Sequence, residues 1–318
     1  MNPEAVKRQG TVSLSWAQRE AVLFYCRTAA ASGAALILRD LVELLPLDVT
    51  EGELEEAISK DDFLASRVLV ESGLVLLKQP GSDQETVQKA LDEAEERRRR
   101  AIANVEAGMR FSRFFSEGMA FVAIAGTNSY LSARPDDDID YYVVTRTDGM
   151  WAFMLKALIL SRIASKTDKP AHQPFCFSFV MDERRWREEF GRQRTALSAR
   201  DTLTAKVFSG YDAYLSILEN APWMRSYFPK FYDRRLAEAE ANAKANRSRR
   251  RGSRVVNEFL YLTLGSYVHL RAWVMNRRLA KAGKTDAVFK TWIGPDRLEY
   301  ASRRYVELGK MYQALPSR

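Results

Sequence analysis

The sequence predicts an α+β protein in which a small mixed sheet lies between two regions that are mostly helical. Three apolar runs have the length and composition of buried strands, at 121–125, 139–145 and 175–181. On both sides of this segment, apolar residues recur at the three- and four-residue intervals of helices. We therefore expect four parts: a helical domain at 1–82, a linking helix at 83–118, a core at 119–183 and an all-helical region at 184–318.

The N-terminal domain is expected to be winged-helix-like, with several short helices followed by a strand. Helices are predicted at 14–30, 36–45, 50–58 and 63–72, and a strand at 74–77. Thr50 and Glu53 have the spacing of a capping box, which marks the start of the third helix.

Winged-helix domains often bind DNA through their last helix. In this chain that helix would present three acidic side chains with one serine and one arginine, namely Asp61, Asp62, Glu71, Ser66 and Arg67. An acidic surface repels phosphates, so we do not expect DNA binding and expect the domain to pack on the core or on a partner.

Helical spacing also predicts the elements around the core. One long helix is expected at 83–115, and a helix at 150–164 is expected to cover the sheet with Trp151, Leu155, Leu158, Ile159 and Ile163. Five further helices are predicted at 184–192, 199–219, 232–246, 254–282 and 296–314. The polar, glycine-containing stretch 241–253 is expected to be a mobile connection.

The most informative motif is a small polar turn followed by two closely spaced acids. Gly126 follows the first strand, and Thr127, Asn128 and Ser129 add short donors beside it. A glycine lets backbone amides approach a phosphate closely. Asp138 and Asp140 begin the next strand, where alternation places both carboxylates on one face. Such a pair is suited to hold Mg²⁺ together with substrate phosphates.

This combination resembles the signature of the polymerase-β-like nucleotidyltransferase superfamily, a Gly-Ser turn followed by Asp-x-Asp. Further segments are similar to an uncharacterised prokaryotic branch of that superfamily with helical N- and C-terminal regions, including 133–140, 144–146, Trp151, 174–179 and 214–229. The resemblance covers roughly residues 100–232 well and the flanks loosely.

The resemblance implies a Mg²⁺- or Mn²⁺-dependent enzyme that transfers a nucleoside monophosphate from an NTP to a hydroxyl acceptor. It assigns the metal to Asp138 and Asp140, and phosphate binding to Gly126, Thr127 and Ser129. Arg134 is expected to neutralise the leaving pyrophosphate, although it can equally pair with Asp136. An RNA end, a protein side chain and a small alcohol are candidate acceptors.

The chain departs from the family signature at two positions. Thr127 replaces the usual serine, which keeps a hydroxyl group. The third carboxylate of the family is not obvious, because the strand at 175–181 offers only Ser178 inside it. Asp182, at the end of that strand, is the best available candidate for the third catalytic acid.

Composition limits the classes of protein that need to be considered. The 318 residues carry 49 basic and 41 acidic side chains, a net charge of +8 that attracts polyanions. Cys26 and Cys176 are the only cysteines, too few for a zinc site together with two histidines. The start of the chain lacks an apolar signal segment, and charges interrupt the apolar stretch 255–275, so we expect a cytoplasmic protein without a membrane partner.

Two other functions remain open at this point. The first is a degenerate nucleotidyltransferase fold that binds nucleotide without catalysis, which the missing third carboxylate favours. The second is a nucleic-acid-binding regulator that uses the winged-helix-like region and the two arginine blocks, at 97–100 and 247–254.

Overall fold

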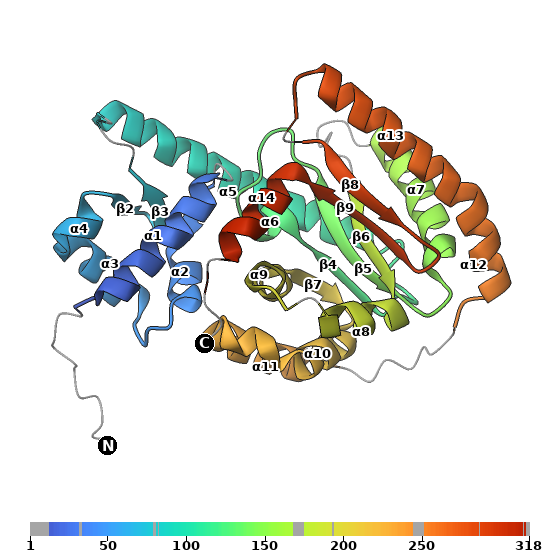
Figure 1. Cartoon of the computed structure of the whole chain (residues 1–318), viewed down its shortest axis with the longest axis horizontal. Helices are drawn as coiled ribbons and strands as arrows, with labels where there is room; N and C mark the ends of the chain where they lie inside the picture. The colour runs from blue at the N-terminus through green and yellow to red at the C-terminus, as the bar shows by residue number, and fades with distance from the viewer. Residues whose placement is uncertain are drawn as a thin grey trace. The chain divides into compact units, whose positions relative to one another are not determined.

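The computed structural model describes residues 13–31, 34–78, 81, 83–167, 175–192, 194–243, 251–285, 287–313 and 315. The chain is an α+β protein with a six-stranded mixed sheet and a separate three-stranded antiparallel sheet (Figure 1). It divides into two compact units, Met1–Glu95 and Glu96–Arg318. The predicted connection at 241–253 and the second arginine block lie largely outside the described residues.

The first unit combines short helices with the three-stranded sheet. Its elements are α1 (Trp16–Ala31), β1 (Leu36–Ile37), α2 (Leu38–Leu44), α3 (Glu51–Lys60), α4 (Asp62–Ala65), β2 (Val68–Glu71), β3 (Leu74–Leu77) and the start of α5 (Gln84–Ser112). The capping box of α3 is confirmed: Thr50 accepts from the Glu53 amide, and the Glu53 carboxylate accepts from the Thr50 amide at 2.8 Å.

The predicted helix at 63–72 is wrong for most of its length. Helix α4 ends at Ala65, and the chain then forms β2, which pairs antiparallel with β3. Ser72 and Gly73 adopt positive φ angles of 53° and 74°, which form the tight turn between the two strands. The valines in β2 favour a strand over a helix because their branched side chains pack well on a pleated surface.

The second unit contains the six-stranded sheet, in the order β7-β4-β5-β6-β9-β8. The strands are β4 (Phe121–Ile124), β5 (Ile139–Thr145), β6 (Phe175–Asp182), β7 (Lys206–Ser209), β8 (Phe289–Ile293) and β9 (Arg297–Ser302). Strands β5 and β6 pair in parallel, and the other pairs are antiparallel. The three strands that the sequence predicted therefore lie in this sheet, at positions two to four.

Helices surround this sheet and connect its strands. They are α6 (Gly126–Ser129), α7 (Met150–Thr167), α8 (Glu183–Arg192), α9 (Ala196–Thr204), α10 (Tyr211–Asn220), the 3₁₀ turn η1 (Pro222–Ser226), α11 (Pro229–Asn242), α12 (Arg254–Leu260), the π-helical turn η2 (Tyr261–Gly265), α13 (Ser266–Lys281) and α14 (Arg303–Tyr312). Among the described residues, none of these helices has the length and apolarity needed to cross a membrane.

The prediction of an all-helical region at 184–318 is wrong, because three strands of the sheet come from it. Strand β7 interrupts the predicted helix at 199–219, and β9 replaces the first turns of the predicted helix at 296–314. In β9 the buried Leu298 and Ala301 are three positions apart, a spacing that resembles a helix, although in a strand it places them on opposite faces. Strand β8 pairs with β9 and completes the edge of the sheet.

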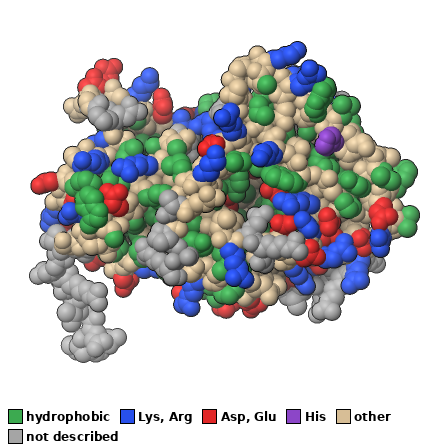
Figure 2. All heavy atoms as spheres, viewed as in Figure 1, with side chains coloured by type: hydrophobic (Ala, Val, Ile, Leu, Met, Phe, Trp, Pro, Cys, Tyr) green, Lys and Arg blue, Asp and Glu red, His purple; other side chains and the backbone are tan. Residues whose placement is uncertain are grey.

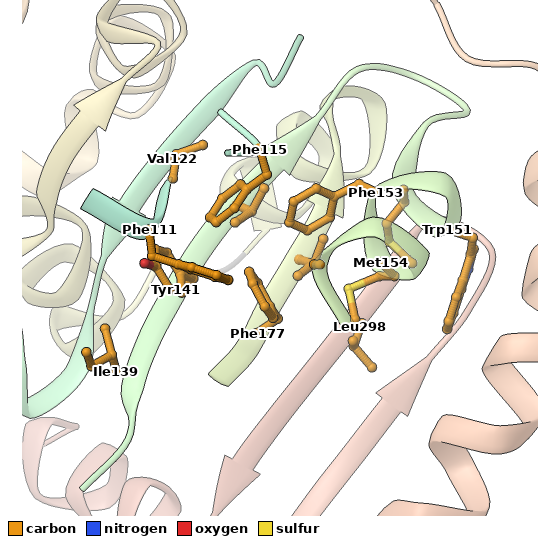
Figure 3. Close-up of a cluster of buried hydrophobic side chains, with 14 of the residues drawn as sticks. Phe111, Phe115, Val122, Ile139, Tyr141, Trp151, Phe153, Met154, Phe177 and Leu298 are labelled. Atoms are coloured by element: carbon orange, nitrogen blue, oxygen red, sulfur yellow. The ribbon is translucent and has the colours of Figure 1, made fainter. Parts of the chain in front are cut away.

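A dense aromatic core holds one face of the sheet against α5 and α7 (Figure 3). The rings of Phe111 and Phe175 stack at 3.9 Å with an interplanar angle of 1°, and the Tyr141 hydroxyl donates to the Gly108 carbonyl at 2.6 Å. Each fully buried aromatic ring contributes about 1.5–3 kcal/mol. The side chains of Ile139, Tyr141 and Val143 in β5 all point into this core.

Helix α7 covers the sheet with only part of the face that was predicted. Trp151, Phe153 and Met154 are buried, whereas Ile159 and Ile163 are more than half exposed. The helical spacing of apolar residues predicted the helix correctly, but it predicted the orientation of the helix only in part.

Candidate active site

The structure brings Asp138 and Asp140 together on the face of the sheet opposite the aromatic core. Ile139, between them, is 1% exposed and belongs to that core, so its two neighbours point the other way. Asp140 pairs with Cys176 across the parallel ladder, and the Cys176 side chain hydrogen-bonds to both carboxylates. The predicted pairing of the two acids on one face is confirmed.

Gly126 lies directly against the second of these carboxylates. Its φ angle is +66°, and a Cβ atom at this position would lie 2.9 Å from Oδ2 of Asp140. The Ala125 amide donates to the Asp140 carbonyl at 3.0 Å, which fixes the end of β4 beside the start of β5. A side chain at this position would have to displace the Asp140 carboxylate, so the turn and this acid lie in direct contact.

A buried amide pair holds the turn in place. The Asn104 side chain donates to Oδ1 of Asn128 at 2.7 Å, and the Asn128 side chain donates to the Asp138 carbonyl at 2.7 Å. Asn128 is fully buried. Helix α5, the turn and the acid pair are therefore linked by hydrogen bonds, and Asn128 has a structural position that the sequence did not reveal.

The hydroxyl groups of the turn differ in their positions. Thr127 is half-buried, whereas Ser129 is buried and its hydroxyl donates to the Gly126 carbonyl at 2.8 Å. The prediction that Ser129 contacts a phosphate is not supported by this placement, because its hydrogen stabilises the turn itself. Gly126 and Thr127 remain the phosphate-binding candidates of the turn.

Arg134 belongs to a group of arginines beside Asp136 and Asp137, in the connection that precedes the acid pair. Its amide donates to the Asp137 carboxylate at 2.9 Å, and Arg100 donates to the neighbouring Ala133 carbonyl at 3.4 Å. Burial, followed by the charges of Arg304 and Arg97, lowers the pKa of Arg134. Guanidinium groups from α5, from the connection between α6 and β5, and from α14 therefore lie close together, with Asp137 and Asp136 nearby.

Arg97 and Arg304 are site candidates that the sequence did not identify. Arg97 lies one turn before Arg100 on α5, and its Nη1 atom is buried without a hydrogen-bond partner in the described part of the chain. The sequence marked Arg97 only as part of a charged block. For Arg304 no sequence signal pointed to the site, because α14 is far away in the chain.

Asp182 does not lie at the site, which corrects the prediction that it is the third acid. It pairs with Thr145, five positions along β5 from Asp140, a separation of roughly 16 Å at the rise of a strand. Its carboxylate accepts from the Arg185 amide at 2.8 Å and caps helix α8. Because β5 and β6 are parallel, the start of β6 lies beside Asp140, and Cys176 and Ser178 occupy that place.

The environment raises the pKa of both acids of the pair. Burial, and then the charge of Asp138, raises the pKa of Asp140 to about 7. Burial also raises the pKa of Asp138, and Asp137 and Asp136 add to this effect. A divalent cation between the two carboxylates would lower both pKa values, because it stabilises both negative charges.

The donors at this site fit a hard divalent cation that is completed by substrate oxygens. Mg²⁺ is commonly bound by one or two carboxylates together with phosphates. In the described part of the chain, no group of three or more His, Cys, Asp or Glu side chains is arranged to hold a metal ion. The two carboxylates are therefore the protein ligands that this site can offer.

A second polar cluster connects the turn to α9 and α14. The hydroxyl groups of Tyr130 and Tyr305 donate to the two oxygens of the Asp201 carboxylate, the latter at 2.6 Å. The guanidinium of Arg200 lies 4.5 Å from the centre of the Tyr130 ring. Burial raises the pKa of Asp201 to about 7. Tyr130 follows the glycine turn directly, so this cluster supports the site from outside it.

Comparisons with known proteins found no matching family model, no matching curated protein and no matching solved structure.

Proposed function

We propose that this protein is a Mg²⁺-dependent nucleotidyltransferase that moves a nucleoside monophosphate from an NTP to a hydroxyl acceptor. The observation that carries the proposal is the contact between Gly126 and Asp140, with Asp138 on the same face. Two carboxylates beside a glycine turn provide metal ligands and close access for phosphates in one place.

Each part of the site has a proposed role. Asp138 and Asp140 hold Mg²⁺ or Mn²⁺, which when bound stabilises charge on the reacting phosphate. The backbone amides of Gly126 and Thr127, with the Thr127 hydroxyl, bind the triphosphate. Arg134, supported by Arg97 and Arg304, balances the charge of the departing pyrophosphate.

The first unit supports the proposed winged-helix-like architecture. Its elements follow in the order α1-β1-α2-α3-α4-β2-β3, with the sheet order β1-β3-β2. The acidic side chains on the segment 61–71 still argue against a phosphate-binding surface there. We propose a packing or partner-binding role for this unit, with RNA or protein as candidate acceptors for the enzyme.

A second candidate function is nucleotide binding without transfer. It is favoured by Cys176 and Ser178, which occupy the strand positions beside Asp140 where a third acid would activate the acceptor. A thiol whose pKa is raised by burial and by two adjacent carboxylates is a poor general base at neutral pH. The nucleic-acid-binding regulator has no comparable observation in its favour.

One experiment distinguishes these functions. The full-length protein is incubated with each α-labelled NTP, Mg²⁺ and a cell extract as the source of acceptor. Transfer of label, lost in Asp138→Asn and Asp140→Asn but kept in Asp182→Asn, is the expected result. Asp182 is a matched control because it is an acid of the same sheet that lies at the other end of β6.

Two outcomes would change the assignment. Mg²⁺-dependent NTP binding without transfer or pyrophosphate release would select the binding module. NTP binding that is equal in the wild type and in both site variants would reject the site altogether.

A further inference from the structure

The outer face of the helical segment α12–η2–α13 carries an unusual number of exposed apolar side chains. Val255 is 77% exposed and Leu262 is 67% exposed, and Phe259, Leu270 and Trp273 are each more than half exposed. The opposite face is buried and includes Asn257, Gly265, Val268 and Ala272. The segment therefore carries apolar side chains on its solvent side as well as on its packed side.

These residues form one continuous stripe. They follow each other at intervals of three or four positions, or of eight across Ser266, which places them on one side of a helical rod about 40 Å long. A groove of about 500 Å³ opens beside the stripe and is lined by Leu262, Gly265, His269, Leu270, Trp273 and Ile293. In Figure 2, hydrophobic side chains gather over the region where Figure 1 places α13.

The charges on the same segment are almost all positive. Its basic side chains are Arg254, Arg271, Arg277, Arg278 and Lys281, and its single acid, Glu258, pairs with Arg254 at 2.8 Å. Most of the positive charge lies beyond the end of the stripe, where the Arg277 guanidinium is 4.7 Å from the centre of the Trp273 ring. The surface is therefore complementary to a partner that is apolar and anionic.

This charge distribution argues against pairing with a second copy of the chain through the same face. In a symmetric contact the same patch meets itself, and its single acid, Glu258, is already paired with Arg254, so the patch offers no acidic partner to its other four basic side chains. Like charges without neutralising partners oppose such an association. A lipid interface instead combines an apolar layer with anionic headgroups, and Trp, Lys and Arg are the side chains that favour its boundary.

We propose that this face binds the surface of an anionic lipid bilayer, with the α12–η2–α13 segment lying in the membrane plane. The stripe would enter the boundary between headgroups and acyl chains, and the basic residues would contact anionic headgroups. This mode of binding needs no spanning helix. It departs from the sequence-based expectation that the protein has no membrane partner, and it does not depend on the proposed enzymatic function.

The test is flotation of the full-length protein with two kinds of vesicle, phosphatidylcholine alone and phosphatidylcholine mixed with phosphatidylglycerol. Binding is expected only to the anionic vesicles, and it should weaken as salt is raised. The variant Phe259→Ser/Leu262→Ser/Trp273→Ser should bind at least about tenfold more weakly, because three large apolar side chains no longer become buried.

A matched control is Phe114→Ser, which removes a side chain of the same unit that is 65% exposed but lies away from the stripe. It should bind vesicles like the wild type, and circular dichroism should show that all variants are folded. Equal loss in the control and in the triple variant would overturn the proposal, as would failure of the wild type to bind anionic vesicles. A concentration-dependent dimer that is lost in the triple variant, without vesicle binding, would assign the face to a second copy instead.

Discussion

Gly126 shows how a single residue links the fold to the candidate chemistry. Its positive φ angle of 66° is strained for any side chain, and a Cβ atom would also press on the Asp140 carboxylate. We expect Gly126→Ala to lower the free energy of unfolding by about 1–2 kcal/mol through the backbone term. It should additionally weaken Mg²⁺-dependent NTP binding, because the displaced carboxylate is a proposed metal ligand.

Gly118 supplies the matched control for this variant. Its φ angle is +83°, and a Cβ atom there meets nothing within 4 Å. Gly118→Ala should therefore show a similar loss in denaturant unfolding and unchanged nucleotide binding by calorimetry. If the two variants bind nucleotide equally well, the contact between Gly126 and Asp140 has no role in the site.

Single residues also show where sequence reasoning succeeded and failed at the site. Asp138, Asp140 and Gly126 were found because local strand alternation and turn chemistry fix their relationship within a few residues. The position of Asp182 relative to the site depends on which strands pair and in which direction. The position of Arg304 depends on the contacts that α14 makes. A single sequence does not specify such long-range pairings, so the proposed third acid was placed at the wrong end of β6.

At the scale of elements, the strands that the sequence did not predict are short or polar on one face. Strand β7 contains four residues, all of them partly exposed, and Gly210 with a φ angle of +83° separates it from α10. A Cβ atom at Gly210 would lie 1.9 Å from the Ala120 carbonyl oxygen, so the turn is packed directly against β4. The partner strand that stabilises β7 is far away in the sequence, and helical spacing therefore seemed continuous across it.

The polar cluster of Tyr130, Asp201 and Tyr305, which connects the glycine turn to α9 and α14, should make the free energy of unfolding depend on pH. The ordinary pKa of an aspartate is 3.8. In the folded protein, burial disfavours the charged form of Asp201 and raises its pKa to about 7. Between these values the folded state holds a proton that the unfolded chain has released. The free energy of unfolding should therefore decrease as pH rises from 3.8 to about 7, and change no further above it.

The variant Asp201→Asn tests this dependence while keeping one oxygen that accepts from a tyrosine. It should gain stability relative to the wild type as pH rises through this range, measured by urea unfolding at several pH values. Tyr130 and Tyr305 donate to this group, Arg200 lies over the Tyr130 ring, and none of the three is changed. Parallel stability curves for the two proteins would show that Asp201 keeps its ordinary pKa.

At the scale of the whole molecule, the proposed catalytic groups are all contained in the second unit. Gly126 begins α6, and Asp138 and Asp140 lie at the start of β5. The arginines come from α5, from the connection between α6 and β5, and from α14. The boundary of the units at Glu95 and Glu96 falls inside α5, so a division there would cut a helix whose later turns bear Arg97 and Asn104.

A fragment that begins at Gln84 keeps α5 whole and removes the three-stranded sheet. Because the aromatic core and the hydrogen bonds of the turn lie within the second unit, we expect this fragment to fold and to bind Mg²⁺-NTP with the affinity of the full chain. Circular dichroism checks folding, and isothermal titration checks binding. A folded fragment that has lost nucleotide binding would show that the first unit takes part in the site, whereas retained binding with lost transfer would place acceptor recognition in the first unit.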